Sequence, residues 1–76
     1  MIDLAAMRRA AGLTQTELAA SLGVGQAQVS EIERQDDMLI STLASYLAAL
    51  RVEAKLVVQM GDQLVTYDLT ARKGKR

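Results

Sequence analysis

Apolar residues recur at helical spacing through most of the chain. The clearest pattern is the segment 13–34, LTQTELAASLGVGQAQVSEIER, in which Leu18 and Ala19 fall on one helical face and Val29 falls on another. Gly23 lies between the two faces, where a glycine can take the left-handed conformation that ends one helix and turns the chain. The pattern therefore predicts two short helices that cross at a tight turn, which is a helix-turn-helix.

Capping residues give the ends of these two helices. Thr14 followed three residues later by Glu17 is a capping-box pattern, so the first helix of the motif is expected to begin there. The second is expected to span residues 26–34.

A further helix is predicted on each side of the motif. Asp3 is expected to cap the earlier one, over residues 3–11, with Met7 on its apolar face. Ser41 is expected to cap the later one, which ends near residue 51 and has leucines at helical spacing. The first two thirds of the chain are therefore predicted to be helical.

Beyond residue 52 the period of the pattern changes from helical to alternating. Residues 54–60 and 63–69 flank Gly61-Asp62, a two-residue sequence suited to a β-hairpin turn. The predicted register pairs Ala54 with Leu69, Lys55 with Asp68, Leu56 with Tyr67, Val57 with Thr66 and Val58 with Val65. Apolar residues then gather on one face. Because a two-stranded sheet is marginal alone, the hairpin must pack on the helices, on a second copy or on another partner.

The composition limits the available chemistry. The chain has 76 residues, enough for one domain; 50% are hydrophobic, and its two aromatic residues are both Tyr. It contains neither His nor Cys, which excludes zinc sites, disulfides and thiol chemistry and removes the usual general base near neutral pH. No catalytic residue, metal site or cofactor is predicted.

No apolar run is long enough to span a bilayer, and no secretory signal is visible. A cytoplasmic protein without a membrane partner is expected.

The net charge is zero at pH 7, which by itself does not favour binding to nucleic acid. The distribution of charge is more informative, because arginines flank the helix-turn-helix and a basic run ends the chain. This tail, residues 71–76, is expected to be disordered. It either keeps the protein in solution or attracts DNA or an acidic partner.

The helix-turn-helix resembles the lambda-repressor/Cro-type (XRE) family. The family pattern of Glu-Leu-Ala, Leu-Gly-Val and Ile-Glu is filled here by residues 17–19, 22–24 and 32–33. Gly25 departs from it, since the family more often has Ser or Thr at that helix cap. The resemblance implies a mainly α fold: a four-helix lambda-repressor-like DNA-binding domain over residues 1–52, followed by a C-terminal β-hairpin over residues 53–70.

The same resemblance implies that the second helix of the motif reads DNA bases. A Gln amide can bind adenine through both its donor and its acceptor in the major groove, and Ala can touch the thymine methyl group. The residues expected to face base edges are Gln26, Ala27, Gln28, Ser30 and Glu31. The alternative is that they are simply the solvated side of an amphipathic helix.

Phosphate contacts are expected from the start of the first motif helix and from the flanking arginines. The free N–H groups and the macrodipole of a helix N-terminus attract a phosphate. The residues expected to contact phosphate are Arg8, Arg9, Gln15, Thr16 and Arg34, with Arg34 and one of the first two arginines favoured. The alternative for an exposed arginine is that it only keeps the protein soluble.

The second half of the chain resembles the HigA-type antitoxins. The run DMLISTL at residues 37–43 is followed by Tyr46-Leu47, Ala49-Leu50 and a strand region, as in that family. The family usually has Gly-Gly after Ala-Leu, where this chain has Arg51-Val52. The resemblance implies a transcriptional repressor that controls its own operon and binds a HigB-like, mRNA-cleaving toxin.

A repressor of this size is expected to act as a homodimer on double-stranded DNA, at a palindromic operator with half-sites about one helical turn apart. The hairpin is the expected dimer or partner surface, through Leu56, Val58, Met60, Val65, Tyr67 and Leu69. The fourth helix is the main alternative.

Other functions are weighed against this one. The chain could be a stand-alone or phage-type regulator without a toxin partner, or a toxin-binding module whose DNA binding is vestigial. An enzyme would need paired carboxylates in a cleft, and Asp36-Asp37 is predicted to lie in an open loop.

Overall fold

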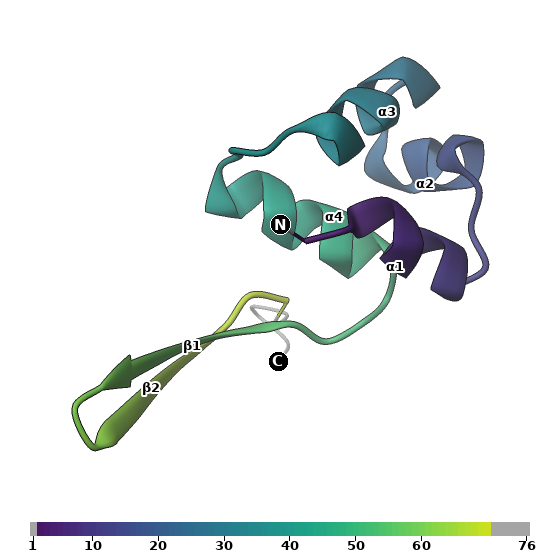
Figure 1. Cartoon of the computed structure of the whole chain (residues 1–76). Coiled ribbons are helices and arrows are strands. Elements are labelled where there is room, and N and C mark those ends of the chain that lie inside the picture. Colours follow the sequence, from purple (N-terminus) through teal and green to yellow (C-terminus); the bar gives the residue numbers. More distant parts are fainter. Residues whose placement is uncertain (1, 71–76) are drawn as a thin grey trace.

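The computed structural model describes residues 2–70, so the predicted disordered tail lies outside the described residues. The described elements are, in order, α1 (Leu4–Ala10), α2 (Gln15–Leu22), α3 (Gln26–Arg34), α4 (Ile40–Ala49), β1 (Lys55–Met60) and β2 (Gln63–Asp68). Figure 1 shows the helices gathered in one body and the hairpin extending away from it. The predicted order, four helices and then a hairpin, is confirmed.

The first two helices begin where their caps were predicted. Asp3 accepts a hydrogen bond from the backbone N–H of Ala6 at 3.0 Å. The capping box is complete: the Thr14 hydroxyl accepts from the Glu17 N–H at 3.0 Å, and the Glu17 carboxylate accepts from the Thr14 N–H at 2.9 Å. These bonds satisfy backbone donors that have no partner within the helix.

The turn between α2 and α3 depends on a glycine, as predicted. Gly23 has a φ of 75°, in the left-handed region, and the N–H of Val24 donates to the carbonyl of Ala19 at 3.0 Å. This bond closes the end of α2 and sets the direction in which α3 leaves. Gly25 then caps α3 without a side chain to contribute.

The core lies where α2, α3 and α4 meet, with α1 closing one side (Figure 1). Leu18, Val29 and Tyr46 are fully buried at its centre. Ala19 is 3% exposed, and a larger side chain there would push the packed helices apart. The buried hydrophobic set is completed by Leu4, Leu47 and Leu50.

Two details of the predicted helices are wrong. On α1, Met7 is 40% exposed and Arg8 is the residue that turns inward below Leu4, because residues four apart share a helical face. On α4, the helix begins at Ile40 after Leu39, so Ser41 does not cap it. The preceding loop packs Met38 against the core, which starts the helix earlier than the polar pattern suggests.

The junction between α4 and the hairpin contains an unusual backbone conformation. Arg51 has a φ of 64°, in the left-handed region that favours glycine. This is the position at which the HigA-type pattern has its first glycine. An arginine therefore adopts here the left-handed conformation that a glycine adopts without strain.

The hairpin has the predicted register. Leu56 pairs with Tyr67, Val58 pairs with Val65, and the turn glycine, Gly61, has a φ of 65°. Every residue of both strands is exposed. Only the base of the hairpin, next to the helices, is half-buried. Packing on the helices is thus confined to that base, and both faces of the ribbon remain open.

No helix within residues 2–70 is long and apolar enough to cross a membrane.

Candidate nucleic-acid interface

The outer side of α3 presents polar and small side chains to solvent. Val29 is fully buried and Ile32 is half-buried, so these residues fix which side of the helix faces the core. On the other side, Gln26, Ala27 and Gln28 occupy the exposed first turn. A recognition helix contacts bases mainly with its N-terminal residues, so this is the end that could enter a major groove.

Farther along α3, the residues predicted to contact bases differ in their exposure. Glu31 is exposed, whereas Ser30 is half-buried. The Arg34 guanidinium donates to the Ser30 hydroxyl at 3.2 Å, a contact between residues four apart on the helix. Ser30 and Arg34 therefore form one polar stripe at the edge of the exposed face.

The start of α2 lies beside the start of α3, as two side chains show. The amide nitrogen of Gln26 donates a hydrogen bond to the amide oxygen of Gln15. Gln15 is half-buried and Thr16, next to it, is exposed. The predicted phosphate contacts on α2 and the predicted base contacts on α3 are thus brought together in one surface.

Arg8 is not part of that surface. It is 8% exposed, and its Nε donates to the Glu33 carboxylate at 2.7 Å in an ion pair. Its NH1 also donates to the carbonyl of Leu13 at 2.9 Å. Because the guanidinium is enclosed and bonded to protein groups, the predicted phosphate contact through Arg8 is not supported. Arg9 is exposed, so it remains the candidate for a phosphate contact at this end of the motif.

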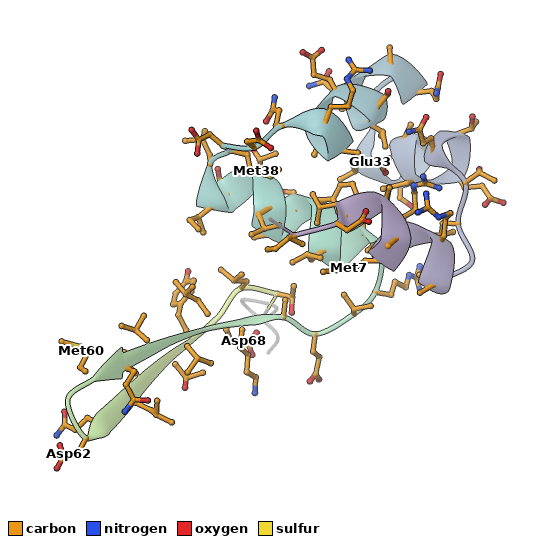
Figure 2. All side chains as sticks on the ribbon, in the orientation of Figure 1. Met7, Glu33, Met38, Met60, Asp62 and Asp68 are labelled. Carbon is orange, nitrogen blue, oxygen red and sulfur yellow. The ribbon has the colours of Figure 1, made fainter. Side chains whose placement is uncertain are left out.

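Glu33, labelled among the helices in Figure 2, is the centre of a buried polar network. One carboxylate oxygen lies 2.7 Å from Arg8 Nε and 2.6 Å from the Tyr46 hydroxyl. The other oxygen lies 2.9 Å from the amide nitrogen of Gln15 and 3.4 Å from Arg8 NH2. The Tyr46 hydroxyl also lies 3.1 Å from the carbonyl of Leu4. The network therefore joins all four helices.

The network shifts the pKa values of its members. Burial alone would raise the pKa of Glu33, but the hydrogen bonds from Arg8, Tyr46 and Gln15 outweigh it, so the pKa lies below its usual range. Burial and the hydrogen bond to Glu33 raise the pKa of Tyr46. The hydrogen bond to Glu33 raises the pKa of Arg8. Glu33 and Arg8 therefore stay charged at neutral pH. A buried ion pair is tolerable when its lone pairs and protons are satisfied, as they are here.

The sequence contains a signal for this network in the placement of two charges. Arg8 lies four residues after Leu4 on α1, and Glu33 lies four residues after Val29 on α3. Each charge therefore falls on the apolar side of its helix, with the opposite sign on the other helix. Two such misplaced charges indicate a buried pair, because either one alone would be costly.

The hairpin surface is separate from the α3 surface and lies at the far end of the molecule (Figure 1). Leu56, Val58 and Val65 are each between 42% and 48% exposed, and Met60 and Tyr67 are more exposed still. Leu69, the last residue predicted for the dimer or partner surface, is half-buried at the base of the hairpin. The structure therefore leaves most of this apolar set uncovered.

Comparison of the chain with known protein families also identifies a helix-turn-helix. A helix-turn-helix family model matches residues 4–56, which covers all four helices and the start of β1. The chain belongs to this helix-turn-helix family.

Within that family, the chain is similar to HigA antitoxins. It is 37% identical over 62 residues, 79% of its length, to a Mycobacterium tuberculosis protein named Putative antitoxin HigA2. It is 39% identical over 71 residues, 90% of its length, to a second protein of that organism named Putative antitoxin HigA3. The matches span 61% and 63% of these relatives, so the chain covers less than two thirds of either.

Solved structures show the same similarity over nearly the whole chain. A chain described as DNA-bound antitoxin HigA3 superposes with a TM-score of 0.78 at 37% identity, covering 96% of this chain and 95% of that one. A HigA antitoxin described as bending DNA through a unique dimerization gives a TM-score of 0.75 at 38% identity, covering 93% and 92%.

Proposed function

We propose that this protein is a sequence-specific DNA-binding repressor and the antitoxin of a type II toxin–antitoxin pair, which represses its own operon and neutralises a HigB-like, mRNA-cleaving toxin. The observation that carries the proposal is the exposed, polar first turn of α3, placed beside the start of α2 by the Gln26–Gln15 hydrogen bond. The DNA-bound state described for the HigA3 structure supports it. In this role the protein is not an enzyme and works in the cytoplasm, where its operon lies.

We propose one contact with DNA for each residue of this surface. Gln26, Ala27 and Gln28 contact base edges from the first turn of α3, with Ser30 and Glu31 farther along the groove. Thr16 and Gln15, with the N-terminus of α2, contact one phosphate. The exposed Arg9 and Arg34 contact phosphates on either side.

Binding to DNA from upstream of the gene tests the proposal, with a scrambled fragment as control and with titrated salt. Gln28→Ala should weaken binding to the native fragment by about 1–3 kcal/mol and leave the scrambled one unaffected, because a base contact carries sequence information. Arg34→Ala should weaken both fragments and lower the salt slope by about one. Equal losses on both fragments for Gln28→Ala would contradict the base contact.

We propose that the hairpin joins two copies into the dimer that reads a palindrome. Its exposed apolar face, centred on Val58 and Val65, is what face-to-face packing against the hairpin of a second copy would cover. Val58→Lys should convert the protein to a monomer in sedimentation equilibrium and weaken operator binding. Thr66→Lys, on the opposite face of the same hairpin, is the matched control and should remain dimeric. A dimer that survives Val58→Lys would move the interface to α4.

The antitoxin role has its own test. Co-expression with the neighbouring reading frame should relieve the growth arrest that frame causes, and the two products should purify together. If expression of the neighbouring reading frame alone does not slow growth, and this protein still binds its operator, the protein is a stand-alone regulator.

A further inference from the structure

We propose that Glu31 is a specificity-determining residue: its carboxylate accepts a hydrogen bond from the N4 amino group of a cytosine in the major groove. The inference rests on the proposed DNA-binding function and adds to it the identity of one base in the half-site. It starts from a difference between the two acidic side chains of α3.

The two glutamates of α3 have opposite surroundings. Glu33 is buried, and side chains from the three other helices satisfy its carboxylate. Glu31 is exposed, and within residues 2–70 its carboxylate has neither a hydrogen-bond partner nor a cation at ion-pair distance. Arg34, the basic residue of the same helix, donates to the Ser30 hydroxyl instead. Glu31 therefore presents a negative charge whose accepting capacity is unused.

This charge lies among the residues proposed to contact bases. Glu31 follows Gln28 by three residues and Ala27 by four, so the three side chains share one face of α3. With Ile32 and Gln35 they border an open hollow on the helix surface. Glu31 lies about 4.5 Å farther along the helix axis than Gln28, which exceeds the spacing of roughly 3.4 Å between base pairs. The two side chains therefore address different base pairs.

A negative charge at this place is unfavourable on most DNA sequences, because the phosphates repel it. The chain has no excess of positive charge to offset the repulsion, since its net charge is zero at pH 7. The repulsion is offset where the DNA presents a hydrogen-bond donor to the carboxylate. Glu31 therefore favours sites with a donor at one position and disfavours the others.

The pattern of donors in the major groove decides which base this is. A carboxylate can only accept hydrogen bonds, whereas guanine and thymine present acceptors there. Adenine presents its N6 amino group beside the N7 acceptor, which matches an amide better than a group with two acceptor oxygens. Cytosine presents its N4 amino group and no acceptor. Glu31 therefore selects cytosine, whereas the amide of Gln28 suits adenine.

Two substitutions separate the charge of this side chain from its shape. Glu31→Gln keeps the size and adds a donor, and Glu31→Ala removes both the charge and the acceptor. Both variants should fold as the wild type does, because the Glu31 side chain is exposed and makes no contact that the helices need. Circular dichroism checks this. Gln28→Ala is the matched control on the same face, since it removes a base contact without removing a charge.

The first measurement selects preferred sites from operator DNA that is randomised within one half-site. The wild type and Gln28→Ala should both prefer cytosine at one position by about tenfold. Glu31→Gln should exchange that preference for adenine. Glu31→Ala should lose it and bind scrambled DNA more tightly, because a repulsive charge is gone. If Glu31→Ala keeps every base preference of the wild type, or binds scrambled DNA more weakly, the proposal is overturned.

The second measurement replaces that cytosine with N4-methylcytosine. Its methyl group takes the place of the N4 hydrogen that faces the major groove, while the base still pairs with guanine. The wild type should bind this operator about tenfold more weakly, and Glu31→Ala should bind it as tightly as the unmodified one. Equal weakening of both proteins would overturn the contact. A wild type that does not prefer the native fragment to the scrambled one would instead refute the proposed function.

Discussion

The helical body and the hairpin of this protein are stabilised in different ways. Leu18, Val29 and Tyr46 are fully buried in the helical body, and around them a polar network is satisfied by its own helices. In the hairpin every strand residue is exposed, although its apolar side chains are as large. Figure 2 shows Met60 near the tip of the ribbon, far from the helices. The first region can fold on its own contacts, whereas the second needs another surface to bury its side chains.

The largest effect on the free energy of unfolding is expected in the helical body, and a substitution in the hairpin serves as its comparison. Leu18→Ala should lower the free energy of unfolding by about 2–5 kcal/mol, because it leaves a cavity in the packed core. Val57→Ala, on the hairpin face away from the proposed dimer surface, should change it by no more than about 0.5 kcal/mol. Urea denaturation followed by the helical circular dichroism signal measures both. Equal losses would mean that the hairpin is part of the helical core.

A second test uses pH. The folded pKa of Glu33 lies below its unfolded value of about 4.3, so its contribution to stability is present above that pH and is lost as the pH falls toward the folded pKa. Glu33→Gln should therefore flatten the dependence of the unfolding free energy on pH below about 4.3. A slope that persists in Glu33→Gln would show that other carboxylates cause the acid sensitivity.

The smallest expected effect lies at the junction of the two regions. Arg51→Gly should raise the free energy of unfolding by roughly 0.5–1 kcal/mol, since relief of the left-handed conformation outweighs the extra freedom of glycine in the unfolded chain. Val52→Gly, which relieves no positive φ, should not stabilise. Thermal denaturation of both variants checks this, and equal shifts would mean that Arg51 is not strained.

Local rules predicted the parts of this fold that depend on neighbours in the chain. The capping box at Thr14 and the turn at Gly23 are set by residues within one helical turn, and the hairpin register follows from alternation around Gly61. The exposed first turn of α3 was predictable for the same reason. A mainly α fold with a C-terminal hairpin follows from these features.

The errors occur where distant residues decide. Arg8 looks like a surface arginine until Glu33, twenty-five positions away, encloses it. Ser41 is a good cap by itself, but the packing of Met38 starts the helix before it. The link from Glu33 to Gln15 likewise depends on how α2 and α3 cross. Spacing along one helix can place a charge on its apolar side, but how the helices cross decides which partner on another helix that charge meets.

The hairpin has two free edges, and the kind of assembly depends on which edges of two copies pair. Each outer edge of β1 and β2 presents backbone N–H and C=O groups that are available to another strand. If the same strand of two copies pairs, the assembly is two-fold symmetric and closes as a dimer. If β1 of one copy pairs with β2 of the next, every added copy exposes a fresh edge and the array grows without limit. The ribbon that suits this protein to dimerise therefore also makes it a candidate for fibre formation when it is overproduced without its DNA or its partner.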